Sequence, residues 1–246
     1  MASSAGSSSE ISQPAVRQGV APLRAGKGYS FVLRRLHSLT GIVPIGAFLL
    51  EHFFSNAFAQ NGPAAYNDTV KFLTGLPFVT WIECLFIWTP ILFHALYGFF
   101  IWYRGETNVF DYPWMGNWMY TAQRWTGGVT FVYIVFHTTT MRFLGDHLLT
   151  HPEHGFTKVW TEFQNPWIVA FYVIGIVAAS WHFAYGLWLF AAKWGLAVGR
   201  NAHRKFGYVC LGIALLLMVV GLTTVRAFLT QAPPQAAPSS QTLVVH

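Results

Sequence analysis

Four histidines lie inside separate apolar stretches of the sequence, where ionisable side chains are rare. They are His52, His94, His137 and His182. An imidazole at membrane depth costs several kcal/mol unless it has a partner. Imidazole nitrogen is also a common ligand of haem iron and of other transition metals. The four residues therefore predict a buried site in which histidines bind a metal or relay protons.

The position of each histidine within its stretch sorts the four into two levels. Counted from the nearest inner-end cation, or from His37 in the first stretch, His94 and His182 lie ten and eleven residues deep, whereas His137 and His52 lie thirteen and fifteen. At about 1.5 Å per residue these depths are roughly 15–16 Å and 20–22 Å. Two stacked haems with two histidine ligands each require an inner pair, His94 with His182, and an outer pair, His52 with His137.

The residues around the histidines repeat in the same two pairs. His94 and His182 each begin the pattern His-x-x-Tyr-Gly, which ends at Gly98 and Gly186. The residue four positions after a helical histidine lies on the same face, so each glycine leaves room for a porphyrin beside the imidazole. His52 and His137 each follow a Thr-Gly pair that comes soon after an arginine. Two kinds of repeated half-site favour two haems over a single zinc or copper ion.

Charged and polar residues gather at the inner ends of the same stretches. Arg34, Arg35 and Arg124 are candidate partners for haem propionates, which arginine binds through two parallel hydrogen bonds. Anchoring of the helix ends at the cytoplasmic surface explains them equally well. Further candidates for the rim of the site are His37, Ser38 and Gln123.

Glu83 is an acidic residue inside the second apolar stretch. It lies eleven residues before His94, on a similar helical face. A carboxylate in this position could accept a proton when a quinone nearby is reduced or a quinol oxidised. A neutral, hydrogen-bonded structural role is the alternative, and both remain open.

The composition requires an apolar solvent around the chain. Of the 246 residues, 54% are hydrophobic and 10% are charged, against roughly 25% charged residues in soluble domains. The net charge of +6 fits Lys and Arg in cytoplasmic loops better than a nucleic-acid partner. Cys84 and Cys210 both fall in apolar segments and form no Cys-x-x-Cys pair, which argues against a disulfide framework, a zinc site or c-type haem attachment.

Five apolar stretches are long enough to cross a membrane. They cover roughly 36–58, 77–103, 125–144, 166–192 and 206–228. The fold expected is an all-α polytopic bundle of five transmembrane helices.

The charged residues and the two ends of the chain complete this plan. A membrane domain at 29–231 is expected between a disordered cytoplasmic tail at 1–28 and a short tail at 232–246. With the N-terminus inside, eleven Lys and Arg fall on the cytoplasmic side and four outside. By the positive-inside rule the N-terminus is in and the C-terminus out.

Several of these motifs together resemble one known family. The segments Arg-Arg-Leu-His-Ser-Leu-Thr-Gly at 34–41 and Gln-Arg-Trp-Thr-Gly at 123–127, with the two His-x-x-Tyr-Gly segments, are similar to the dihaem cytochrome b subunit of succinate:quinone oxidoreductases. The likeness is to the single-polypeptide, five-helix type, and it covers roughly residues 29–228.

The resemblance implies a multi-pass subunit of the bacterial cytoplasmic membrane that serves succinate dehydrogenase or fumarate reductase in the respiratory chain. It would anchor a flavoprotein carrying FAD and an iron–sulfur subunit on the cytoplasmic side. The resemblance is also compatible with assembly of the complex into a higher oligomer. His94 and His182 would ligate the haem b near the iron–sulfur subunit, and His52 and His137 the outer haem b. Electrons would pass between the clusters and menaquinone, and no residue of this chain would act on succinate.

One departure and two alternatives accompany the resemblance. Some family members carry a glutamate for proton transfer two residues before the fourth-stretch ligand, where this chain has Ser180, so that proton path is not expected. A cytochrome b subunit of a hydrogenase or formate dehydrogenase also uses histidines on several helices. A proton-coupled transporter is the alternative from another class.

Overall fold

A computed structural model describes residues 29–106, 108–145 and 147–233, and every regular element in these ranges is helical. The expected all-α fold is therefore confirmed for this part of the chain. The expected N-terminal tail, and all but the first two residues of the C-terminal tail, lie outside the described ranges.

The first apolar stretch forms an almost continuous rod of three elements. These are α1 (Tyr29–Ile42), α2 (Pro44–Ala57) and η1, a short 3₁₀ helix (Phe58–Asn61). The break falls before Pro44, which has no N–H to donate. Backbone bonds from Val43 to Leu39 (2.8 Å) and from Ala47 to Val43 (3.1 Å) carry the helix across it.

The second stretch contains a wide turn just before a proline. It comprises α4 (Val79–Ile82), the π-helical η2 (Glu83–Trp88) and α5 (Thr89–Arg104). Pro90 cannot donate to the preceding turn. The backbone N–H of Thr89 donates to the Cys84 carbonyl, and so does the Thr89 hydroxyl at 2.8 Å. Single π turns of this kind are frequent at functional sites.

The remaining long helices are α6 (Met115–Thr138), which continues into the π-helical η3 (Thr139–Phe143), α8 (Pro166–Lys193) and α9 (Arg200–Thr230). In the described ranges, four helical segments are long and apolar enough to cross a membrane: Ser30–Asn61, Val79–Arg104, Pro166–Lys193 and Arg200–Thr230. With 24 residues, α6 is also long enough. It is not among the four because polar residues lower its mean hydropathy at both ends, Gln123 and Arg124 in its first half and His137 with the following threonines near its end.

Two of the helices extend beyond the apolar stretches from which they were predicted. The third helix begins at Met115 rather than near residue 125, and α9 begins at Arg200 rather than near 206. Hydropathy marks only the part suited to lipid, whereas helical hydrogen bonding continues through polar residues. Three short helices in the connecting loops were not expected: α3 (Pro63–Thr74), the 3₁₀ helix η4 (Pro152–His154) and α7 (Gly155–Glu162).

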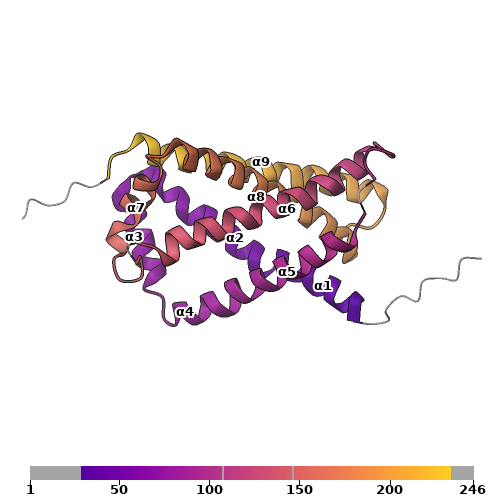
Figure 1. The fold of residues 1–246 in the computed structure, drawn as a ribbon, viewed down its shortest axis with the longest axis horizontal. Coiled ribbons are helices and arrows are strands. Elements are labelled where there is room, and N and C mark those ends of the chain that lie inside the picture. Colours follow the sequence, from indigo (N-terminus) through magenta and orange to yellow (C-terminus); the bar gives the residue numbers. More distant parts are fainter. Residues whose placement is uncertain (1–28, 107, 146, 234–246) are drawn as a thin grey trace, which may run out of the picture.

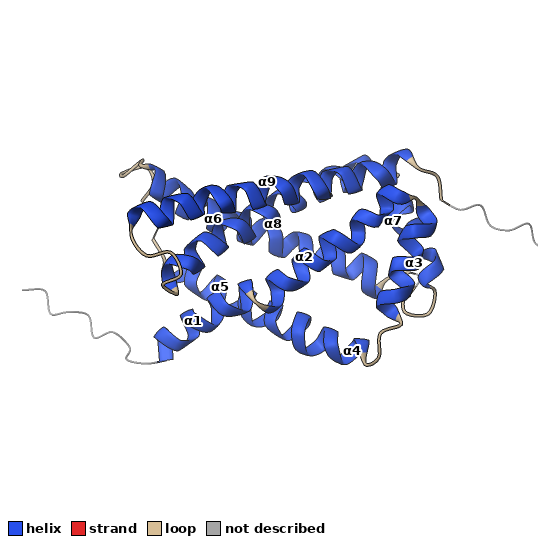
Figure 2. Cartoon of the chain, turned by 180° about the vertical axis from the view of Figure 1, so that it is seen from behind, coloured by secondary structure: helices blue, strands red, loops and turns tan. Residues whose placement is uncertain are grey.

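The long helices run lengthwise, and α3 and α7 cover one end of the bundle (Figures 1 and 2). Helix α8 is central and packs against α1, α6 and α9, while α1 also packs on α5 and α2 on α9. Many large apolar side chains remain exposed, including Phe54, Leu92 and Leu216. Their number and spread fit a surface that faces lipid.

The buried apolar cluster lies at the covered end and not at the middle of the bundle. Phe156 of α7 is completely buried there, in contact with Tyr66 of α3 and Phe228 of α9. Phe163 and Tyr172 extend the same cluster towards α8. The contacts of this cluster join α3 and α7 to α8 and α9.

Replacing Phe156 with alanine should lower the free energy of unfolding by about 3–5 kcal/mol, because it opens a cavity in this cluster. Thermal or denaturant unfolding of the protein in detergent measures the change. Phe54→Ala is the matched control, since that ring is 68% exposed. Equal losses in the two variants would contradict this placement of the core.

Candidate functional site

A cavity of about 1120 Å³ runs through the middle of the bundle, and all four of the candidate histidines line it. It exceeds the about 300–1,000 Å³ of an ordinary small-molecule site. Its walls are mostly apolar and come from every long helix. Since protein interiors are normally close-packed, a cavity this large is suited to large, mainly apolar groups.

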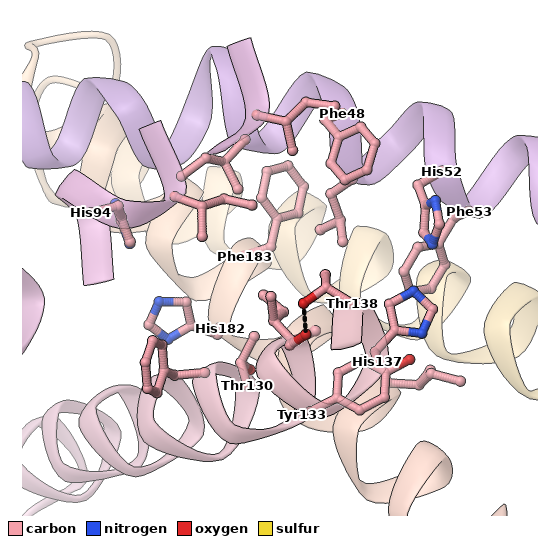
Figure 3. Close-up of a pocket in the computed structure, with 18 of the residues that line it drawn as sticks. Phe48, His52, Phe53, His94, Thr130, Tyr133, His137, Thr138, His182 and Phe183 are labelled. Atoms are coloured by element: carbon pink, nitrogen blue, oxygen red, sulfur yellow. Dashed lines mark hydrogen bonds between the residues drawn. The ribbon is translucent and has the colours of Figure 1, made fainter. Parts of the chain in front are cut away.

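The histidines meet across the cavity in two pairs (Figure 3). The ring centres of His94 and His182 are 6.2 Å apart, and those of His52 and His137 are 5.7 Å apart. A metal–imidazole bond is about 2 Å long, so a metal between two rings places their centres about 6 Å apart. Both pairs therefore have the separation that one shared metal ion requires.

The two pairs lie further apart along the bundle than their counted depths suggest. The His182 ring lies against Gly127 of α6, and His137 is ten residues further along that helix, about 15 Å. The counted depths gave a difference of only about 5 Å. The reason is that Arg124 lies nine residues inside α6, whereas Lys193 ends α8, so the reference cations do not share a plane.

Backbone carbonyls orient the inner pair. The Nδ1 atom of His94 is 2.9 Å from the His37 carbonyl, and Nδ1 of His182 is 3.1 Å from the Gln123 carbonyl. A carbonyl can only accept, so each Nδ1 carries the hydrogen and each Nε2 keeps its lone pair. A histidine that binds a metal through Nε2 needs this arrangement.

Two glycines allow the inner histidine rings to lie directly against the backbone of the neighbouring helices α1 and α6. A Cβ atom at Gly41 would lie 2.5 Å from Cε1 of His94, and one at Gly127 would lie 2.8 Å from Cε1 of His182. Real Cβ atoms do not approach so closely, so an alanine would displace the ring. The sequence associated the Thr-Gly pairs with His52 and His137, whereas the structure places Gly41 and Gly127 against the two inner rings. The contacts join residues on different helices, so the sequence did not reveal them.

The outer pair is held by side chains. Nδ1 of His137 is 3.1 Å from the Tyr172 hydroxyl. Asn56 donates to the His52 carbonyl at 2.7 Å, and its Nδ2 lies 3.3 Å from Nδ1 of that ring. The Tyr66 hydroxyl, outside the membrane segments, donates to Asn56 Oδ1 at 3.2 Å. Burial raises the pKa of Tyr66, so it stays a neutral donor.

Gly98 and Gly186 both line the cavity, as the expected room for a porphyrin requires. Their nearest neighbours are side chains of the inner rim. A Cβ atom at Gly98 would lie 3.2 Å from His37, and one at Gly186 would lie 3.5 Å from Gln123. The His37 ring itself stacks on His94, with ring centres 4.0 Å apart.

The inner-rim candidates divide into those that line the cavity and those that do not. Arg124 lines it, donates to the Trp102 carbonyl at 3.0 Å and lies over the Tyr120 ring. The smaller rim candidates, His37, Ser38 and Gln123, also line it. Arg34 and Arg35 are not among the lining residues.

Lys193 is a rim residue that the sequence marked only as the end of a span. It lines the cavity, and its Nζ donates to the Arg34 carbonyl at 2.6 Å. Arg35 Nη1 donates in return to the Lys193 carbonyl at 2.5 Å. These bonds join the first and fourth long helices at the inner end, a link that separate stretches of sequence do not reveal.

Glu83 lies at the other end of the cavity, in an ion pair. Its Oε2 is 2.6 Å from Nη2 of Arg142, and both side chains line the cavity and are about one-quarter exposed. The two residues come from the two π-helical turns, η2 and η3. The sequence placed Arg142 near the end of its stretch without pairing it with Glu83.

These features fit haem better than a bare metal ion. Two imidazoles face each other at each level, the inner pair presents an unprotonated Nε2, and the apolar cavity extends around both pairs. In the described part of the chain, no hydrogen bond joins Nε2 of any of the four histidines to another residue. A single zinc ion would need neither the volume nor the two levels.

Comparison with known proteins relates the chain to a family model and to a bacterial relative. Residues 110–221 match the family model described as succinate dehydrogenase/fumarate reductase transmembrane subunit. The chain is also 35% identical, over 198 residues, to the succinate dehydrogenase cytochrome b558 subunit of Bacillus subtilis (strain 168). That alignment covers 80% of this chain and 96% of the relative.

Gly127→Ala should reduce the amount of reducible b-type haem that the purified protein retains, because the new methyl group displaces the His182 ring. A reduced-minus-oxidised absorption spectrum with haem quantitation measures the loss. Gly212→Ala is the matched control on α9, since a Cβ atom there meets nothing within 4 Å. Full haem content and an unchanged spectrum in Gly127→Ala would show that the close contact is unimportant.

Proposed function

Because the chain belongs to the succinate dehydrogenase/fumarate reductase transmembrane subunit family, we propose that it is a dihaem cytochrome b. It anchors a succinate:quinone oxidoreductase in the membrane and connects the partner subunits with quinone. The observation that carries this proposal is the presence of two facing histidine pairs in one apolar cavity. No residue of the chain is assigned to bond-making chemistry on succinate.

Each histidine pair would hold one haem b, His94 with His182 at the inner level and His52 with His137 at the outer level. Haem b supplies reversible one-electron transfer. The chain's own residues orient the imidazoles, and the apolar walls keep water away. The spacing of about 15 Å along α6 supports two such groups in series from one end of the bundle to the other.

The inner rim is assigned to the haem propionates. Arg124 and Lys193 are the cations that line the cavity at this end, and His37, Ser38 and Gln123 supply polar atoms beside them. Arg34 and Arg35 do not line the cavity, which favours the alternative role in which they anchor the helix ends at the cytoplasmic surface.

The five-span arrangement rests on α6 and η3, which together cover residues 115–143 beside α8. The described chain starts at one end of the bundle and finishes at the other (Figure 1), which supports an odd number of spans. Most of the cations gather at the end where α1 starts, including Arg104, Lys193, Arg200, Arg204 and Lys205. This supports an N-terminus inside and a C-terminus outside, in the bacterial cytoplasmic membrane.

The cationic inner end is the proposed docking side for an iron–sulfur subunit and a flavoprotein that carries FAD. Menaquinone is the proposed small-molecule partner. The Glu83–Arg142 pair lines the outer end of the cavity, and we assign Glu83 as a proton acceptor linked to quinone chemistry. The family match argues against the hydrogenase and formate dehydrogenase alternatives, and no described feature favours a proton-coupled transporter.

Four single His→Ala variants test the haem assignment. The wild type should contain two b-type haems per chain by dithionite-reduced spectra and haem quantitation. His94→Ala and His182→Ala should each lose the same haem, and His52→Ala and His137→Ala the other, because each haem would lose one of the two histidines that hold it. His147→Ala, in the exposed outer loop, should keep both. Losses that cross the pairs, or a wild type without haem, would contradict the proposal.

Glu83→Gln should lower the succinate:quinone reductase rate by about 10²-fold, the lower end of the range for a general acid–base residue, while haem content stays unchanged. The matched control is Glu51→Gln, an exposed carboxylate on α2. Steady-state assays with a soluble menaquinone analogue measure the rates. A wild-type rate in Glu83→Gln would leave the Glu83–Arg142 pair with a structural role only.

A further inference from the structure

The outer histidine of α6 is connected to a carboxylate through a buried phenol. Nδ1 of His137 lies 3.1 Å from the Tyr172 hydroxyl, and that hydroxyl donates to Oε2 of Glu162 at 3.2 Å. His137 lies near the end of α6, Tyr172 is on α8 and Glu162 is the last residue of α7. The chain of bonds therefore runs from the outer cover of the bundle to a candidate haem ligand.

The positions of the hydrogens in this chain follow from the groups involved. A phenol has one hydrogen, and a carboxylate can only accept. When Tyr172 donates to Glu162, its oxygen is left to accept, so the hydrogen between Tyr172 and His137 belongs to Nδ1 of the imidazole. Nε2 of His137 then keeps its lone pair towards the cavity, as iron ligation requires.

The phenol is held rigidly in this position. Tyr172 is 5% exposed, and the rings of Tyr133, Phe136 and Phe163 pack around it. A buried hydroxyl needs a partner, and this one has a partner on each side. The geometry is therefore fixed by packing and does not depend on a mobile surface side chain.

Among the described residues, no comparable link joins the other three histidines to a negative charge. His94 and His182 donate to neutral peptide carbonyls, and His52 lies beside the Asn56 amide. Glu162 also lies at the C-terminus of α7, where the helix dipole disfavours an acid. Lys158, one turn earlier, donates to the carbonyls of Met141 and Leu144. An interaction with His137 through Tyr172 would explain why a carboxylate occupies this unfavourable position.

We propose that Tyr172 and Glu162 are positioning residues that orient His137 and lower the reduction potential of the outer haem. The carboxylate polarises the Nδ1–H bond through the phenol, which makes the imidazole a stronger donor to iron. A stronger donor and a nearby negative charge both favour the oxidised, more positive iron. This inference rests on the proposed dihaem function, in which His137 is an axial ligand.

Redox titration of the purified complex, followed by the b-type absorption, tests the inference. Glu162→Gln removes the charge and keeps the shape, and it should raise the reduced-to-oxidised ratio of one haem about tenfold at a fixed ambient potential. For a one-electron couple that is about 59 mV. The other haem should not shift. Glu153→Gln is the matched control, an exposed carboxylate on the same outer loop, and should shift neither haem.

A double-mutant cycle separates the relay from simple proximity of charge. Tyr172→Phe should raise the same haem's potential, and adding Glu162→Gln to it should change little, because the carboxylate acts through the phenol. Additive shifts would overturn the relay, as would an unshifted haem in Glu162→Gln or an equal shift in Glu153→Gln. If Tyr172→Phe loses the haem, the redox titration of Glu162→Gln alone tests the inference, since that variant leaves the phenol in place.

Haem quantitation distinguishes this inference from the proposed function. A wild type with fewer than two haems overturns the dihaem assignment and the relay together. Two haems whose potentials ignore Glu162 overturn the relay alone and leave the function intact.

Discussion

The structure depends on keeping one ring nitrogen of each buried histidine free of hydrogen bonds in an apolar interior. A histidine at membrane depth would normally bond through both ring nitrogens, yet here only Nδ1 has a partner in the described chain. Peptide carbonyls of His37 and Gln123 hold the inner rings, and a phenol holds His137. Each bond fixes the tautomer and directs the other nitrogen into the cavity. The orientation of each of these rings is therefore set by a neighbouring helix and not by the histidine's own helix.

The rest of the fold accommodates that constraint. Gly41 and Gly127 bring two backbones against imidazole rings, which larger side chains would prevent. The close-packed apolar cluster is displaced to the end of the bundle that α3 and α7 cover. The middle keeps a cavity of about 1120 Å³, so this apolar cluster does not extend through the bundle. Groups bound in this cavity would supply much of the internal contact of such a bundle.

The sequence allowed the helical class, most of each apolar helix and the histidine pairing pattern to be predicted, because helical periodicity and hydropathy are local properties. It could not reveal Lys193 at the rim, the Glu83–Arg142 pair or the Tyr172–Glu162 link, since each joins residues from different helices. The distance between levels was underestimated because Arg124 lies inside α6 and not at its end. The polar first half of α6 likewise hid ten helical residues from hydropathy.

An experimental density map of the purified complex tests the central claim most directly. The account predicts one porphyrin between His94 and His182 and a second between His52 and His137, each iron bound by two Nε2 atoms. A map in which these rings are bonded to one another or to other side chains, with no macrocycle between them, would contradict it.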